Sequence, residues 1–178
     1  MTHRSVYLAK YGGSKNQRAH FAIFVPNAQH DRKTVSQDFE SRPTSGTVIH
    51  VVGEPVMAGY VLEIKRNYEC STSRDLKKLV LLGHVDASNV HNPSSADYRK
   101  ENTAKGPLEQ YAARVAPPPR GQNVRAPIDG VRTKRCQEWT MEFLGVLVNE
   151  GLLGPEALQI AQEERDPPTR GIFGYRQA

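Results

Sequence analysis

The chain has 178 residues, 38% of them hydrophobic and 24% charged, and it carries a formal net charge of +5. This length suits one buried core and is short for two domains, and no apolar run approaches the roughly 18 residues that a membrane span needs. Because residues 1–15 have no apolar signal region and the two cysteines are far apart, we expect neither secretion nor a disulfide framework, and we predict a cytoplasmic protein with reduced thiols.

Strands are predicted through the first half of the chain. After a polar arm over 1–18, the segment "HFAIFVP" (20–26) is a short run of strand-forming residues that stops at a proline. The polar, breaker-rich segment 27–46 predicts a loop. The strands that follow this loop are closely spaced in the sequence, which predicts that they form a mainly antiparallel sheet with the strand over 20–26. These further strands are expected over 47–53, 59–68 and 77–85.

The second half of the chain changes to a helical period. A short helix is predicted over 106–115, and a Pro/Gly connector over 116–132 follows it. Two more helices are predicted over 133–152 and 154–165, before an irregular tail over 167–178. The pattern indicates one α+β catalytic domain over 1–178, in which a four- to five-stranded, mainly antiparallel sheet packs against helices.

The predicted helix over 133–152 is strongly amphipathic. Thr133 can cap its first turn and Gly151 can end it. Its apolar stripe points the start of the helix toward the sheet and makes the single tryptophan a packing anchor there. The stripe recurs at three- and four-residue steps and consists of Cys136, Trp139, Phe143 and Leu147.

Cys136 is the first candidate for chemistry. With Thr133 as the N-cap, it is the third helical residue and lies beside unpaired backbone N–H groups at the positive end of the helix dipole. Lys134 and Arg135 add positive charge nearby. Each effect favours the thiolate, which is the reactive form of cysteine. The alternative is a small buried hydrophobic residue, which is the common state of a free cysteine.

His20 and His50 are the candidate partners of this thiol, because each lies within a predicted strand. On neighbouring strands the two rings can bond each other, so that His20 takes the proton from Cys136 while His50 orients His20. Taken singly, each histidine is equally compatible with a structural role. The backbone N–H groups of Cys136 and Gln137, at the helix start, are expected to form part of an oxyanion hole.

Three segments together, "HFAIFV", "IHVVG" and "RCQEW", resemble the circularly permuted branch of the NlpC/P60 papain-like superfamily, which includes the lecithin:retinol acyltransferase-like proteins. The resemblance implies a permuted papain-like arrangement with Cys136 as the nucleophile, His20 as the base and His50 as the third member. The chain departs from that family at Arg135, where asparagine is frequent, and in its long 27–46 loop. We also expect no membrane-anchoring tail of the kind found in that family.

These features predict an enzyme that forms an acyl-thioester on Cys136. Water as the acceptor would make it an amidase, peptidase or thioesterase, and an amine would make it an N-acyltransferase. We expect a small-molecule or peptide substrate, no cofactor and no membrane partner. A permuted papain-like binding module with an inert Cys136 is the non-enzymatic alternative.

A second enzymatic alternative comes from a resemblance to the fungal arginine-containing cyclodipeptide synthases, in the compact size and style of the sequence. It implies an aminoacyl-tRNA donor and a diketopiperazine product. The basic stretches 4–18 and 120–135 would then hold tRNA phosphates. More generally, the anion-binding candidates are Arg18, Arg132, Lys134 and Arg135, although a charge of this size is also compatible with an ordinary solvated surface.

Other motifs are weak, and no metal site is predicted. A zinc set of His20, His50 and Cys136 with Cys70 or His84 matches no standard spacing. Strand alternation places acidic residues such as Glu63 and Glu69 on an outer face or in a turn, so they are not expected to act as an acid pair.

Overall fold

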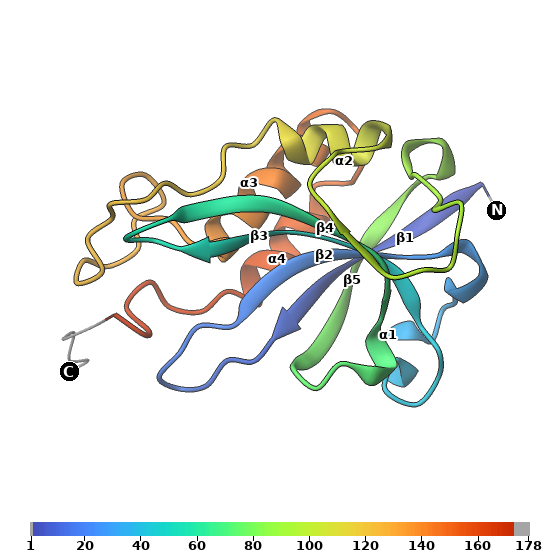
Figure 1. Cartoon of the computed structure of the whole chain (residues 1–178), viewed down its shortest axis with the longest axis horizontal. Coiled ribbons are helices and arrows are strands. Elements are labelled where there is room, and N and C mark those ends of the chain that lie inside the picture. Colours follow the sequence, from blue (N-terminus) through green and yellow to red (C-terminus); the bar gives the residue numbers. More distant parts are fainter. Residues whose placement is uncertain (1, 173–178) are drawn as a thin grey trace.

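A computed structural model describes residues 2–172 and shows an α+β protein with one six-stranded antiparallel sheet (Figure 1). The strands lie in the order β5-β1-β2-β3-β4-β6. Their bounds are β1 His3–Tyr11, β2 His20–Pro26, β3 Ser45–Glu54, β4 Gly59–Glu69, β5 Leu76–Asp86 and β6 Arg99–Glu101. The helices are α1 Val35–Asp38, α2 Gly106–Ala113, α3 Cys136–Asn149 and α4 Glu156–Glu163. The α+β class and the β3–β4 hairpin are confirmed, but six strands replace the expected four or five.

The prediction of a polar arm over 1–18 is wrong, because β1 is an inner strand paired with both β2 and β5. Its apolar residues alternate between two buried faces, with Val6 and Leu8 on one face and Tyr7 on the other. Flanking charges conceal this pattern in the sequence. One of them, Arg4, is itself buried, where it donates hydrogen bonds to the Asn92 side chain at 2.6 Å and to a backbone carbonyl.

Two other short elements were not predicted from the sequence. β6 is a three-residue polar edge strand on β4, and the ion pair between Glu101 and Arg66, 3.0 Å apart, holds it there. α1 lies inside the expected 27–46 loop, where Val35 and the following Phe39 are buried. Both elements are too short to produce a periodic signal, and tertiary contacts stabilise them.

Two cores cover the two faces of the sheet. On one face, Ile23 and Ile49 pack beneath α3, with its buried Trp139 and Phe143. Figure 1 shows α3 and α4 together behind the sheet. On the opposite face a smaller core includes Phe24 and Val48, with α1 and Cys70. Strand alternation therefore sends neighbouring residues of β2 and β3 into different cores.

Helix α3 ends at the predicted place. Gly151 has a φ of +79°, a conformation that favours glycine. The N–H of Leu152 donates to the Leu147 carbonyl at 2.8 Å, and the N–H of Gly151 donates to the Val148 carbonyl at 3.1 Å. This pair of bonds is a Schellman motif, which satisfies carbonyls that the helix itself leaves unpaired.

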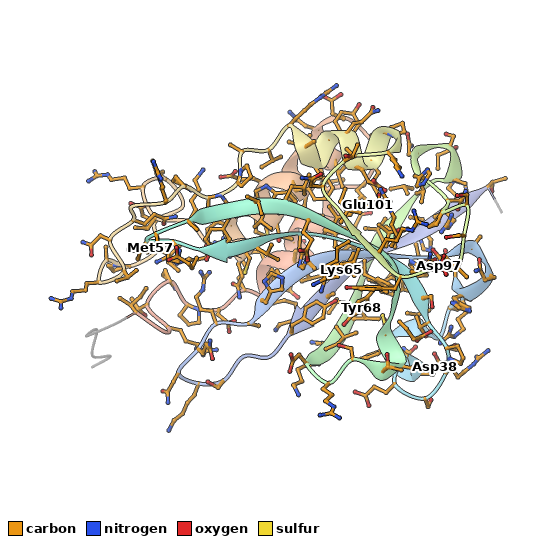
Figure 2. All side chains as sticks on the ribbon, viewed as in Figure 1. Asp38, Met57, Lys65, Tyr68, Asp97 and Glu101 are labelled. Atoms are coloured by element: carbon orange, nitrogen blue, oxygen red, sulfur yellow. The ribbon has the colours of Figure 1, made fainter. Side chains whose placement is uncertain are left out.

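The sheet opens between β2 and β3. β2 pairs with β1 as far as His20 and Tyr11, but its pairing with β3 ends at Ile23 and Ile49. The β1–β2 and β3–β4 hairpins diverge beyond these positions, as Figure 1 shows. The exposed Met57 marks the tip of the β3–β4 hairpin (Figure 2). The opening matters because it exposes backbone groups of β2 that a neighbouring strand would otherwise bond.

The remaining segments connect these elements. The connector over 116–132 contains no helix or strand, as predicted, and neither do residues 167–172. The rest of the predicted tail, 173–178, lies outside the described residues. Over residues 2–172, the helices are too short or too polar for any of them to cross a membrane.

Candidate functional site

Cys136 is the first residue of α3. The helix is fixed beneath the sheet by Trp139, which is fully buried and whose indole N–H donates to the Val115 carbonyl at 3.1 Å. Phe143 packs against the same ring, with the two centroids 5.4 Å apart. The apolar stripe is therefore confirmed as core, and it aims the start of α3 at the opening between β2 and β3.

The prediction that Thr133 caps this helix is wrong. The Thr133 hydroxyl donates to the Pro127 carbonyl at 2.8 Å and accepts from the Asp129 N–H at 2.8 Å, so it belongs to the preceding loop. The Asp129 carboxylate accepts backbone N–H groups from residues 131–133, and these bonds lower its pKa to about 2. Arg135 occupies the N-cap position, which makes Cys136 the first helical residue and not the third.

The surroundings of the Cys136 sulfur differ from the sequence-based expectation. The Phe21 N–H, on the diverging edge of β2, and the Gln137 N–H both donate toward the sulfur and favour the thiolate. Burial has the larger and opposite effect, so that the pKa of the Cys136 thiol is raised overall. The expected activation by the helix start and by nearby cations is therefore outweighed by desolvation in the free protein.

His20, His50 and Glu63 form a hydrogen-bonded chain. His20 Nε2 lies 2.8 Å from His50 Nδ1, and His50 Nε2 lies 3.0 Å from Glu63 Oε1. An ionised carboxylate only accepts, so His50 Nε2 carries a proton and the Nδ1 of a neutral His50 is an acceptor. His20 must then donate through Nε2, which leaves the lone pair of its Nδ1 available for another proton.

Both histidines are held neutral. Burial lowers the pKa of His20 to about 3, with smaller contributions from His50 and Lys65. Burial also lowers the pKa of His50, although the bond to Glu63 opposes this shift. Figure 2 shows Lys65 beside Tyr68 on the near face of the sheet, with the Lys65 Nζ atom 5.3 Å from the centre of the Tyr68 ring. This cation further disfavours a positive charge on the imidazoles.

Within the histidine chain, His20 is the member that lines the same cavity as Cys136. Alternation places His20 and His50 on the face opposite α3, where His20 also contacts the Tyr11 ring. The Cys136 sulfur and the His20 ring are not hydrogen-bonded to each other, but both residues line one cavity of about 310 Å³. Catalytic bonds are often looser before substrate binds and tighten in the complex.

The cavity wall combines apolar and cationic residues. Pro55, Ile128 and Ile172 contribute apolar surface, and Tyr60 contributes a phenol group whose pKa is raised to about 12, chiefly by burial. The positive side chains on the wall are Arg18, Arg135 and Arg170. The described residues of the wall include no aspartate or glutamate. This composition suits a small ligand with an apolar part and a negative group.

Comparison with known proteins gives one result. Residues 6–154 match DUF6540, a family of unknown function. The chain belongs to the DUF6540 family. The match extends from β1 to the end of the turn after α3, and it includes Cys136 and all three members of the histidine chain. No curated protein and no solved structure matches the chain.

Among the anion-binding candidates of this DUF6540 protein, two have carboxylate partners within the fold. Arg18 donates to Glu138 at 2.6 and 3.1 Å, and Lys134 lies 2.5 Å from Glu142. Their charges are thus largely balanced by protein groups. Arg132 is exposed and outside the described cavity wall, whereas Arg135 lies on it.

Glu63 is the site residue that the sequence interpretation missed. Alternation suggested an outward-facing acid, but the β3–β4 register pairs Glu63 directly with His50. The predicted hairpin already contained this signal, because extending the pairing from its turn brings the two residues opposite each other. Glu69, by contrast, accepts from Thr44 and Ser71 and has a structural role.

The structure does not assemble the zinc set considered from the sequence. Cys70 is buried in the smaller core, where burial raises the pKa of its thiol, and His84 lies on the edge strand β5. Within residues 2–172, no three side chains of the His, Cys, Asp and Glu types are grouped as metal ligands would be.

Proposed function

We propose that this DUF6540 protein is a cysteine-dependent acyl-transfer enzyme that forms a thioester on Cys136. One observation carries the proposal: Cys136 lines one cavity together with His20, which is the end of the hydrogen-bonded chain His20–His50–Glu63. A neutral imidazole with a fixed tautomer and an available nitrogen, at the same cavity as a thiol, supports nucleophilic cysteine catalysis.

The proposed reaction has two steps. His20 Nδ1 takes the proton of the Cys136 thiol as the sulfur attacks the carbonyl carbon of the substrate. A carbon–sulfur bond forms, and the bond to the leaving group breaks as that group takes the proton back from His20. Water or an amine then attacks the thioester, which releases the acyl group and restores the thiol. His50 and Glu63 keep Nδ1 of His20 free for both proton transfers.

Backbone N–H groups would stabilise the negative oxygen of the tetrahedral intermediate. Those of Cys136 and Gln137 lie in the first turn of α3, where N–H groups have no backbone acceptor within the helix; in the free protein the Gln137 N–H donates toward the Cys136 sulfur. The dipole of α3 also favours negative charge at this end. Such preorganised donors typically contribute a large part of acyl-transfer catalysis.

Intact-protein mass spectrometry after exposure to acyl thioesters and activated esters tests the proposal. We expect one acyl adduct in the wild type and in Cys70→Ala, and none in Cys136→Ala. Cys70→Ala is the matched control because it removes the other thiol of the chain and leaves the cavity unchanged. Absence of an adduct with every donor class, or an adduct that persists in Cys136→Ala, would refute the mechanism and favour a binding module.

The permuted papain-like arrangement is part of the same proposal. It is supported by the chain order, in which strands that carry His20 and His50 precede the helix that begins with Cys136. An experimental structure of the acylated protein would test it. The expected geometry has His20 Nδ1 within hydrogen-bonding distance of the Cys136 sulfur or of a water that attacks the thioester.

An aminoacyl-tRNA donor with a cyclodipeptide product is the second candidate function. The observation that favours it is the cavity wall, whose described members include three arginines and no acidic residue, with two of the arginines paired to carboxylates behind the wall. Binding of tRNA should then weaken steeply as salt increases, because phosphate contacts release counterions. Absence of tRNA binding at low salt would remove this candidate and leave the general acyl-transfer proposal intact.

A further inference from the structure

Arg135 differs from the other two arginines of the cavity wall. Arg18 is paired with Glu138 at 2.6 Å, and Arg170 is paired with Asp166 at 2.5 Å. In the part of the chain that the structure describes, no carboxylate lies within ion-pairing distance of the Arg135 guanidinium. Its side chain nevertheless lies partly buried on the wall beside Cys136.

The fold holds one part of this guanidinium and leaves another part available. Arg135 Nη1 donates to Gln122 Oε1 at 2.6 Å and to the Lys134 carbonyl at 3.1 Å. Its Nε and Nη2 atoms have no acceptor among the described residues, and neither is enclosed as a buried, unpaired atom. These two nitrogens form the edge that binds both oxygens of a carboxylate or phosphate in parallel.

Gln122 keeps that edge in place. This buried side chain donates to the Pro119 carbonyl at 2.7 Å and accepts from the Lys134 N–H at 2.7 Å. The guanidinium is thus fixed on one side before any ligand arrives. Fixing a side chain in its binding geometry reduces the entropy lost on association.

We propose that Arg135 is a specificity residue that binds a carboxylate on the acyl substrate. The proposal rests on the proposed function, because it assigns the substrate class of the Cys136 site. Since Arg135 directly precedes Cys136, the carboxylate would belong to the same small molecule as the reacting carbonyl. A cavity of about 310 Å³ accommodates an acyl group of this size.

Two matched acyl donors test this assignment. The phenyl thioesters of 4-carboxybenzoate and 4-carbamoylbenzoate have nearly equal size and differ by one negative charge. We expect the wild type to acylate Cys136 roughly 10- to 100-fold faster with the carboxylate donor, as the loss of hydrogen bonds to a charged group predicts. Arg135→Gln should reduce this preference to near unity. Arg132→Gln, an equal loss of charge at an exposed neighbouring position, should retain it.

A binding measurement separates this assignment from the acylation chemistry. Cys136→Ala protein has no thiol at this site to acylate, so calorimetry of this variant with 4-carboxybenzamide should show binding alone. Adding Arg135→Gln should weaken that binding roughly 10- to 100-fold, and Arg135→Lys should retain part of it because the charge remains without the paired donors. If Arg135→Gln does not fold by circular dichroism, the Arg135→Lys comparison decides the question.

The outcomes are distinct. Equal acylation by the charged and neutral donors, with equal affinity in the Arg135 variants, would overturn the specificity assignment and leave the acyl-transfer proposal standing. Selective binding of 4-carboxybenzamide, together with no acylation of Cys136 by any donor class, would support the anion site and refute the acyl-transfer proposal. If 4-phosphonobenzamide binds at least tenfold more tightly than 4-carboxybenzamide, the site belongs to a phosphate-bearing ligand and the carboxylate assignment is overturned.

Discussion

Glu63 Oε1 lies 3.0 Å from His50 Nε2, and this contact determines which ring nitrogen of His20 is free. The carboxylate fixes the proton of His50 on Nε2, and His50 in turn fixes the proton of His20 on Nε2. The nitrogen that the proposed mechanism uses, His20 Nδ1, is therefore left free by a carboxylate that His20 does not contact. Such outer partners commonly orient a catalytic imidazole without touching the substrate.

Glu63→Gln tests this relationship. An amide can either accept from His50 or donate to it, so the substitution removes the preference for one tautomer of the chain. We expect the rate of Cys136 acylation to fall by about tenfold, and less than in His20→Ala, where loss of general base catalysis predicts a fall of about 10²- to 10⁴-fold. Single-turnover acylation followed by mass spectrometry measures both rates. Equal rates in Glu63→Gln and the wild type would show that Glu63 does not position the base.

The pH dependence of Cys136 labelling is the second prediction. Because burial raises the pKa of this thiol, little thiolate is present at pH 7 in the free protein. The rate of reaction with iodoacetamide should therefore keep rising through and above pH 8.5, the ordinary value for a free thiol. Cys70→Ala protein isolates the signal of Cys136. Fast labelling that is already at its plateau at pH 6 would show that the helix start and nearby cations overcome burial.

Acid sensitivity of the fold is the third prediction. The pKa of His20 is about 3 in the folded protein, well below its ordinary value of about 6.5. Above pH 6.5 His20 is neutral in both states and leaves stability unchanged. Between pH 6.5 and 3 the unfolded chain binds a proton that the folded chain does not, so the free energy of unfolding falls as the pH falls.

Urea unfolding from pH 7 to pH 4 measures this loss. His20→Gln lacks the titrating ring, so its stability should fall less over the same range than that of the wild type. His3→Gln, at an exposed position on β1, serves as the control and should follow the wild type. Parallel pH profiles for the wild type and His20→Gln would mean that His20 is freely protonated in the folded protein.

Local sequence patterns predicted the elements whose apolar residues recur at a regular spacing. The apolar run of β2 and the Trp139–Phe143 stripe of α3 are examples, because each buries side chains at the period of its own structure. β1 was missed because Arg4 and Lys10 make it look polar, although Arg4 is buried through long-range bonds. A charge with distant partners cannot be distinguished from a solvated one in a single sequence.

The candidate site was predicted in part for the same reason. His20, His50 and Cys136 stood out because their neighbours are apolar. The helix start was misplaced because Thr133 bonds Pro127 and Asp129 in the loop instead of capping α3. The divergence of β2 from β3 arises because the β2–β3 hydrogen bonding ends at Ile23 and Ile49 while the β1–β2 hydrogen bonding continues to His20. No local sequence pattern specifies where either pairing ends. That divergence nevertheless lets residues from opposite faces of the sheet meet at one cavity.

The buried ion pair between Arg66 and Glu109 gives the fourth prediction. It joins β4 to α2 through bonds of 2.5 and 2.6 Å, with both side chains only 3% exposed. Glu109→Ala would leave Arg66 without its buried partner, and the free energy of unfolding should fall by about 3–5 kcal/mol. The remaining bond from Arg66 to Glu101, at a partly exposed position, would offset only a small part of this loss.

The double variant Arg66→Met with Glu109→Leu removes both charges and keeps apolar volume at the contact. Because apolar replacement of a buried pair is often neutral or stabilising, it should be more stable than Glu109→Ala alone. Urea unfolding gives the free energies, and acylation of Cys136 should be unaffected in the double variant because neither residue lines the cavity. A loss in Glu109→Ala below about 1 kcal/mol, the range of a surface pair, would show that water reaches Arg66 and that the pair is not buried in solution.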